Sequence, residues 1–130
     1  MTTYSLQEIA SRHGTDKAAA GHSYIDFYEE LFAPLRDRPI RLLEIGVGGN
    51  EDPRQGGASL RAWKEYFPKA EIIGLDYFDK SRFAEERIHV ERGDQADPVT
   101  LDRLIARYAP FDIVIDDGSH LSRDVIARDL

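Results

Sequence analysis

Cysteine is absent from all 130 residues of the chain, and methionine and tryptophan occur once each. Without a thiol, the chain can form neither a disulfide bond nor a metal site built on thiolates. A protein without disulfides suits a reducing compartment, and we expect this one to work in the cytoplasm.

Long hydrophobic runs are missing too. No stretch approaches the roughly 18 apolar residues of a membrane-spanning helix, and the first residues lack the apolar core of a signal peptide. Basic residues are outnumbered, since 17 Lys and Arg against 24 Asp and Glu give a net charge of −7. A nucleic-acid partner and an anionic membrane are therefore not expected. The length gives room for one domain with a sizeable core.

The most informative stretch begins at residues 41–45, a short apolar strand that contains Glu44 and runs into Gly46-Val47-Gly48-Gly49. A buried parallel strand that enters a glycine turn brings its backbone close to a ligand, and a helix follows from Ser59. A tight connection between a strand and a helix would explain the same residues. The spacing does not match Gly-x-Gly-x-x-Gly, which counts against the rival reading, an NAD-type dehydrogenase domain.

Apolar periodicity predicts the other elements. Further strands are expected at residues 71–76, 87–91 and 111–115, alternating with helices as in a parallel α/β sheet. Asp97 and Pro98 open one helix as its N-cap and first residue, with Leu101, Leu104, Ile105 and Tyr108 facing inward. The remaining helices are expected at 4–12, from Ser23 to Pro34, from Ser59 to Pro68, shortly after Ser81, and over 121–130.

Asp76 ends the second strand, 32 positions after Glu44. In such folds an acid at this place holds the two hydroxyls of a ribose, because a carboxylate accepts two strong hydrogen bonds at once. A solvated aspartate at a strand end is the plainer alternative. Gly93, Asp94 and Gln95 follow the third strand and are expected at the same edge of the sheet.

A second polar cluster, Asp116-Asp117-Gly118-Ser119-His120, leaves the end of the fourth strand. A carboxylate there can bind a hard cation, and a histidine can take a proton at neutral pH. A polar turn without chemistry explains the cluster equally well.

Taken together, the motifs resemble the macrolide-sugar O-methyltransferases, the mycinamicin and demethylmacrocin enzymes, which are class I S-adenosylmethionine-dependent methyltransferases. The resemblance spans about residues 12–120, and its specificity comes from many motifs in one order. They are His13-Gly14-Thr15-Asp16-Lys17, His22-Ser23-Tyr24, Glu44–Gly49, Gly57–Phe67, Gly74–Asp79, Gly93–Gln95 and Asp116–His120.

The resemblance implies a three-layer Rossmann-like fold with a parallel sheet in the order 3-2-1-4. It implies S-adenosyl-L-methionine as cofactor, a magnesium ion, and a sugar hydroxyl of a macrolide-like product as acceptor. Asp117 would be a metal ligand and His120 the general base. The residues that would contact the cofactor are Thr15, Glu44, Gly46, Ser59, Asp76, Gly93, Asp94, Gln95 and Asp116.

The chain departs from the family pattern after the fourth strand. The family continues with an acidic pair that completes the metal site and with more strands, whereas this chain ends at Leu130. We expect one cofactor-binding domain over 1–130 (N-terminal helices in 1–38, the Rossmann-like part in 39–130), truncated after strand 4 and with an incomplete magnesium site. It would be a fragment, a shortened relative, or a module that binds cofactor without turnover. The open edge of strand 4 predicts a homo-oligomer.

Overall fold

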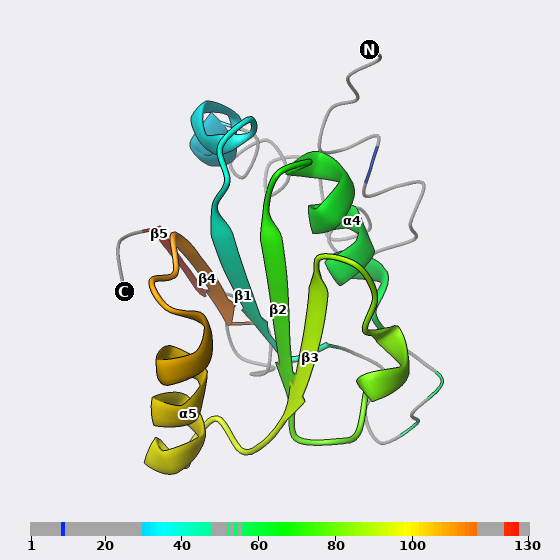
Figure 1. Cartoon of the computed structure of the whole chain (residues 1–130). Coiled ribbons are helices and arrows are strands. Elements are labelled where there is room, and N and C mark those ends of the chain that lie inside the picture. The colour runs from blue at the N-terminus through cyan, green and yellow to red at the C-terminus, as the bar shows by residue number, and fades with distance from the viewer. Residues whose placement is uncertain are drawn as a thin grey trace.

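The computed structural model describes residues 9, 30–47, 52, 54, 56–116 and 124–127, with the backbone alone for 116 and 124–127. Figure 1 shows a central sheet with a helix on each side. The elements are the 3-10 helix η1 (Ala33–Leu35), β1 (Arg41–Ile45), α4 (Ala58–Tyr66), β2 (Glu71–Asp76), the 3-10 helix η2 (Ser81–Phe83), β3 (Ile88–Arg92), α5 (Pro98–Tyr108), β4 (Ile113–Asp116) and β5 (Asp124–Ala127).

The sheet has the strand order β3-β2-β1-β4-β5, and the pairs among the first four strands are all parallel. The predicted order 3-2-1-4 is thereby confirmed, and the bounds of β1 and β2 agree with the sequence prediction.

The end of the chain differs from the prediction. Residues 124–127, expected within a helix, form β5, which pairs antiparallel with β4. The prediction of a sheet truncated after strand 4 with an open edge there is therefore wrong. Val125 and Ile126 are β-branched, and the unpaired backbone groups of β4 offer hydrogen-bond partners that a helix could not use. The reason given for a homo-oligomer, the bare edge of β4, disappears with this pairing.

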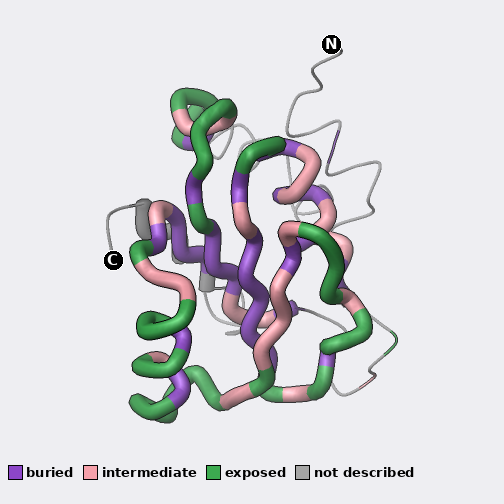
Figure 2. Tube along the Cα trace, viewed as in Figure 1, coloured by how far each residue is buried: buried purple, intermediate pink, exposed green. Residues whose placement is uncertain are grey.

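Two hydrophobic clusters lie on opposite faces of the sheet, because successive side chains of a strand point to opposite sides. Leu42 of β1 belongs to the cluster under α4, and its neighbour Leu43 belongs to the cluster under α5. Figure 2 shows the buried strands running through the middle of the molecule. Helix, sheet and helix thus form the three layers that the family resemblance implied.

Aromatic rings fill the α4 side of the core. Trp63 is 1% exposed, and its ring centroid lies 5.7 Å from that of Phe32 and 6.4 Å from that of Phe67. Leu60 and Phe67 are buried as well. The inward face of α4 is therefore apolar and aromatic, with Trp63 as its packing anchor.

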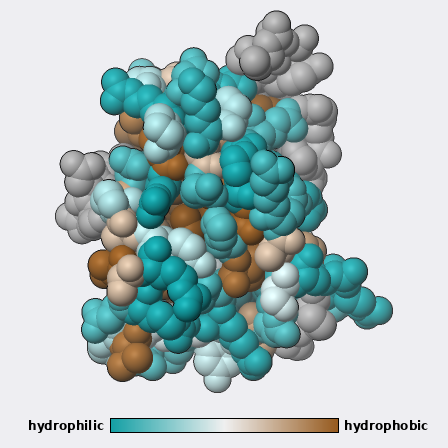
Figure 3. Space-filling view, viewed as in Figure 1, coloured by the Kyte–Doolittle hydropathy of each residue, from teal (hydrophilic) through white to brown (hydrophobic). Residues whose placement is uncertain are grey.

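The inward face of α5 agrees with the prediction only in part. Leu104 is buried, and Leu101 and Tyr108 pack against its cluster, whereas Ile105 is 51% exposed. Hydrophobic side chains are visible on the outer side of α5 at the lower left of Figure 3. The prediction for Ile105 was wrong because a sheet covers only a narrow stripe of an 11-residue helix. The N-cap was predicted correctly, since the Asp97 side chain accepts a hydrogen bond from the Val99 N–H.

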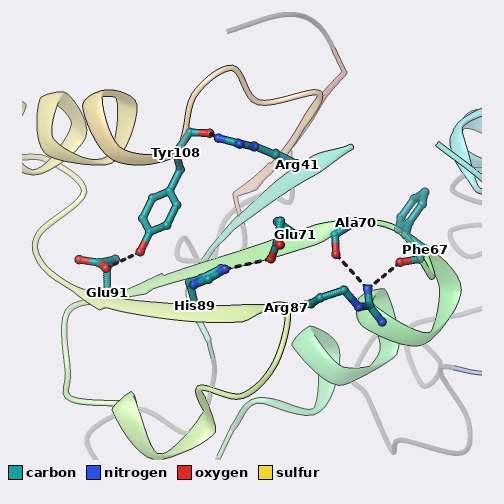
Figure 4. Close-up of polar contacts among 8 residues, drawn as sticks. All are labelled: Arg41, Phe67, Ala70, Glu71, Arg87, His89, Glu91 and Tyr108. Carbon is teal, nitrogen blue, oxygen red and sulfur yellow. Dashed lines mark hydrogen bonds and ion pairs between the residues drawn. The ribbon is translucent and has the colours of Figure 1, made fainter. Parts of the chain in front are cut away.

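Arg87 joins the far end of α4 to the start of β3 (Figure 4). Its guanidinium donates to the carbonyl oxygens of Phe67 at 3.0 Å, Ala70 at 2.9 Å and Lys64 at 3.1 Å. These acceptors include carbonyl groups that have no partner within the helix. The guanidinium therefore caps α4 from outside the helix.

The face of β3 beside α5 carries a polar cluster. His89 Nε2 lies 2.9 Å from Glu71 Oε2, and the Tyr108 hydroxyl donates to Glu91 Oε2 at 2.7 Å (Figure 4). Partial burial and this hydrogen bond raise the pKa of Tyr108. The contact with Glu71 gives His89 a structural role between β3 and β2. The short helix predicted after Ser81 is only the single 3-10 turn η2. Within the described part of the chain, no helix is long and apolar enough to cross a membrane.

Candidate functional site

The C-terminal ends of the parallel strands meet at one edge of the sheet, at the bottom of Figure 1. Gly46 follows β1 there with a φ of 92°, a conformation that favours glycine, and its N–H donates to the Leu75 carbonyl at 2.7 Å. Gly46 thus lies at the junction of strand and turn, as the sequence predicted. The ends of parallel strands, where such a turn lies, are where open α/β sheets bind their ligands.

Glu44 is fully buried near the end of β1 and is held by α4. One carboxylate oxygen accepts a hydrogen bond from the Ser59 hydroxyl, and the other accepts from Trp63 Nε1 at 3.1 Å. A buried carboxylate requires such donors, because burial without them costs several kcal/mol. The structure therefore brings together two predicted site residues, Glu44 and Ser59, and adds Trp63 as a partner that the sequence did not indicate.

Asp76 lies at the end of β2 and is 9% exposed. Its Oδ2 accepts from the Val47 N–H at 2.8 Å, and its Oδ1 accepts from the Phe78 N–H at 2.9 Å. The carboxylate thus fixes the turn after Gly46 against the end of β2. Two carboxylate oxygens offer about four lone-pair positions, so Asp76 can accept further hydrogen bonds from a ligand.

Gly93 follows β3, and its N–H donates to the Asp76 carbonyl at 2.9 Å. A Cβ atom at Gly93 would lie 2.7 Å from Thr100 Cγ2, so a larger residue would push against the first turn of α5. Asp94 and Gln95 are exposed beyond it, and Asp94 Oδ1 accepts from the Ala96 N–H at 2.8 Å. The ends of β1, β2 and β3 therefore carry the predicted residues side by side.

Two further acids lie on the loops beside these strand ends. The Arg54 N–H donates to Asp52 Oδ1 at 3.0 Å and lowers the pKa of Asp52, to which the nearby charge of Lys80 also contributes. Hydrogen bonds from Ser81 lower the pKa of Asp79 in the same way. Both carboxylates are therefore ionised at neutral pH and add negative charge to this edge.

The remaining predicted residues cannot all be placed. Asp116 ends β4 in register with Ile45, which puts its backbone at the same edge. Thr15, Asp117 and His120 lie outside the described residues. Among the side chains that the structure describes, no group of three or more possible metal ligands occurs. The proposed metal ligand and general base therefore remain predictions.

The sequence reasoning missed Lys80, which is 1% exposed and donates from Nζ to the Asp52 carbonyl. Nothing in Asp79-Lys80-Ser81 distinguishes it from a solvated turn. Only the three-dimensional arrangement shows that its ammonium lies between two loops at the site.

The strand order and the buried carboxylates at the ends of β1 and β2 define a Rossmann-like methyltransferase fold. The MycE methyltransferase from the mycinamycin biosynthetic pathway, solved with Mg, SAH and mycinamycin VI, superimposes with a TM-score of 0.85 at 49% identity. That match covers 92% of this chain and 32% of the MycE chain. No protein-family model matches the sequence.

Two curated relatives agree with this structural match. The 8-demethyl-8-alpha-L-rhamnosyl tetracenomycin-C 2'-O-methyltransferase of Streptomyces olivaceus is 50% identical over 121 residues, which are 93% of this chain and 32% of the relative. The mycinamicin VI 2''-O-methyltransferase of Micromonospora griseorubida is 49% identical over 92% of this chain and 30% of the relative. Over nearly its whole length the chain is similar to these O-methyltransferases, and it spans about a third of their length.

Proposed function

We propose that the chain binds S-adenosyl-L-methionine at the ends of β1, β2 and β3 and forms part of a magnesium-assisted O-methyltransferase. The acceptor would be a sugar hydroxyl of a macrolide-like natural product, as the names of the relatives suggest. The observation that carries the proposal is the pair of buried carboxylates, Glu44 and Asp76, on either side of the Gly46 turn. This pair lies where related α/β sheets bind a nucleoside.

Each residue at the edge has a proposed task. Glu44, Gly46 and Ser59 would face the methionine part of the cofactor, with Thr15 and Asp116 as further contacts. Asp76 would accept hydrogen bonds from the ribose hydroxyls, and Gly93, Asp94 and Gln95 would lie beside the adenine. The carboxylates at this edge also favour a cofactor that carries a positive sulfonium, because opposite charges attract across a poorly solvated site.

The chemical step would use residues from the end of β4. When bound, S-adenosylmethionine supplies a methyl group on a sulfonium leaving group. His120 would accept the proton of the acceptor hydroxyl as its oxygen attacks the methyl carbon, and Asp117 would be an oxygen ligand for magnesium. The rest of the edge would align the hydroxyl with the methyl group.

A module that binds cofactor without turnover is the alternative. The relatives are named as O-methyltransferases, which favours the enzyme. We also propose that the protein works in the cytoplasm, since the chain lacks cysteine. We propose that it is a homo-oligomer, because β3 is an outer strand of the described sheet, to which a second chain can add.

Calorimetry on the 130-residue chain tests the cofactor directly. We expect saturable binding of S-adenosylhomocysteine and no comparable heat with NAD, because the glycine turn lacks the dinucleotide spacing. No binding of S-adenosylhomocysteine at millimolar concentration would contradict the proposal. Preferential binding of NAD would instead support the dehydrogenase reading.

Asp76→Ala is expected to weaken S-adenosylhomocysteine binding by about 1–3 kcal/mol, the cost of losing a charge-assisted hydrogen bond. Asp102→Ala is the matched control, because it removes the same charge from an exposed position on α5. Calorimetry gives the affinities, and thermal melting confirms that both variants are folded. Equal affinity of a folded Asp76→Ala variant and the unchanged chain would exclude Asp76 as a ribose contact.

A further inference from the structure

Lys80 is an unusual residue for its place in the chain. It lies in the loop after β2, yet its side chain is 1% exposed and is among the largest that the described core buries completely. A lysine loses much hydration on burial, so its ammonium has to be held by acceptors. Its Nζ donates to the backbone carbonyl of Asp52, which belongs to the connection between β1 and α4. The contact therefore joins the loop after β2 to the connection after β1, at the edge of the sheet where the cofactor is proposed to bind.

A second contact joins the same two segments. A Cβ atom at Gly57 would lie 2.8 Å from two ring atoms of Phe83, so the ring of η2 packs directly on the backbone at the start of α4. Gly57 has a φ of 80°, which favours glycine for a second reason. The guanidinium carbon of Arg61, also in α4, lies 5.9 Å from the centre of the Phe83 ring.

A third set of bonds connects this packing to the site. The Gly57 N–H donates to the Val47 carbonyl at 3.0 Å, and the Val47 N–H donates to Asp76 Oδ2 at 2.8 Å. A series of contacts therefore connects Asp76 to Val47, Val47 to Gly57, and Gly57 to Phe83 of η2. Lys80 precedes η2 in the sequence and links it to the end of β2. These contacts place η2 two residues away from the turn after Gly46, through Gly57 and Val47.

We propose that Lys80 is a positioning residue, whose buried ammonium fixes Asp52, between β1 and α4, and thereby keeps the site in the conformation that binds S-adenosylmethionine. Segment 77–83 then acts as a brace for the glycine turn, with Lys80 fixing one point and Phe83 another. The inference rests on the proposed cofactor, but the brace itself is a property of the ligand-free chain.

The test compares Lys80→Met with Lys80→Arg. Methionine keeps an apolar stem of similar length and removes the cation, whereas arginine keeps a cationic donor. We expect Lys80→Met to weaken S-adenosylhomocysteine binding about tenfold in calorimetry, on the scale of a lost charge-assisted hydrogen bond, and Lys80→Arg to restore most of the affinity.

Lys64→Met is the matched control. The Lys64 side chain is 23% exposed, and its ammonium pairs with the half-exposed Glu85 at 2.5 Å. The substitution Lys64→Met makes the same chemical change and removes an ion pair. It leaves the contact between Lys80 and Asp52 intact. Its affinity for S-adenosylhomocysteine should therefore stay within about twofold of the unchanged chain, as for a surface pair.

Hydrogen exchange without ligand separates the brace from the cofactor. In Lys80→Met, the Gly57 amide should exchange faster than in the unchanged chain, while amides of α5 stay as protected as before. If the unchanged chain does not bind S-adenosylhomocysteine, the proposed function fails, and the exchange comparison still decides on the brace. Unchanged exchange at Gly57, or unchanged affinity in a folded Lys80→Met, would overturn the inference.

A variant that does not fold requires a second measurement. Gly57→Ala places a methyl group against the Phe83 ring and disturbs the brace without changing Lys80. We expect it to lower the affinity for S-adenosylhomocysteine in the same direction as Lys80→Met. Full affinity in a folded Gly57→Ala would count against a brace between the segments.

Discussion

Trp63→Ala is expected to lower the free energy of unfolding by about 3–5 kcal/mol, the range for removing a buried aromatic ring from a core. Trp63 is 1% exposed, packs against Phe32 and Phe67, and donates to Glu44 through its indole N–H. The substitution leaves a cavity under α4 and withdraws a donor from a buried carboxylate. Urea denaturation followed by circular dichroism measures the loss.

Trp63→Phe separates the two causes. Phenylalanine keeps most of the ring packing but lacks the N–H that Glu44 Oε2 accepts, so a loss of about 1–3 kcal/mol is expected. In a Glu44→Gln background, Trp63→Phe should cost less, because a neutral amide depends less on that donor. Equal costs in both backgrounds would show that the charge of Glu44 adds nothing to the bond from Trp63.

His120→Ala is expected to lower methyl transfer by about 10²–10⁴-fold, the usual contribution of a general base. The chain spans about a third of its relatives, so the assay uses a chimera in which it replaces the matching segment of the mycinamicin VI 2''-O-methyltransferase. Alanine removes the group that would take the proton of the acceptor hydroxyl. Binding of S-adenosylhomocysteine should be unchanged, because the proposed cofactor contacts lie at other residues.

His89→Ala in the same chimera is the control for His120. It also removes an imidazole, but His89 pairs with Glu71 across β3 and β2 and lies within a strand. Methyl transfer by this variant should stay close to that of the parent chimera. Loss of transfer with His89→Ala and none with His120→Ala would refute the assignment of the base.

The buried strands were predictable because their apolar residues indicate directly that both faces of each strand are covered. The runs at 41–45 and 71–76 carry apolar residues on both faces and end beside a glycine or at an acid, and the bounds of β1 and β2 follow from them. The same parallel pairing brings Glu44, Asp76 and Gly93 to one edge, which periodicity also indicates.

The sequence predictions were wrong for residues whose structure depends on contacts with a distant segment of the chain. The apolar residues over 121–130 have a spacing that fits a helix, but pairing with β4 makes 124–127 a strand. Ile105 has the right period for the core and lies beyond the area that the sheet covers. The burial of Lys80 depends on a contact 28 positions away, which local sequence cannot reveal.

The capping of α4 by Arg87 has a thermodynamic consequence. The Ser59 and Trp63 side chains tie the beginning of this helix to Glu44, and the Arg87 guanidinium holds the carbonyl groups at its far end. A helix fixed at both ends has little conformational entropy left to lose when a ligand arrives. Ordering α4 should therefore take almost nothing from the affinity for a bound nucleoside, since rigid binding surfaces avoid that cost.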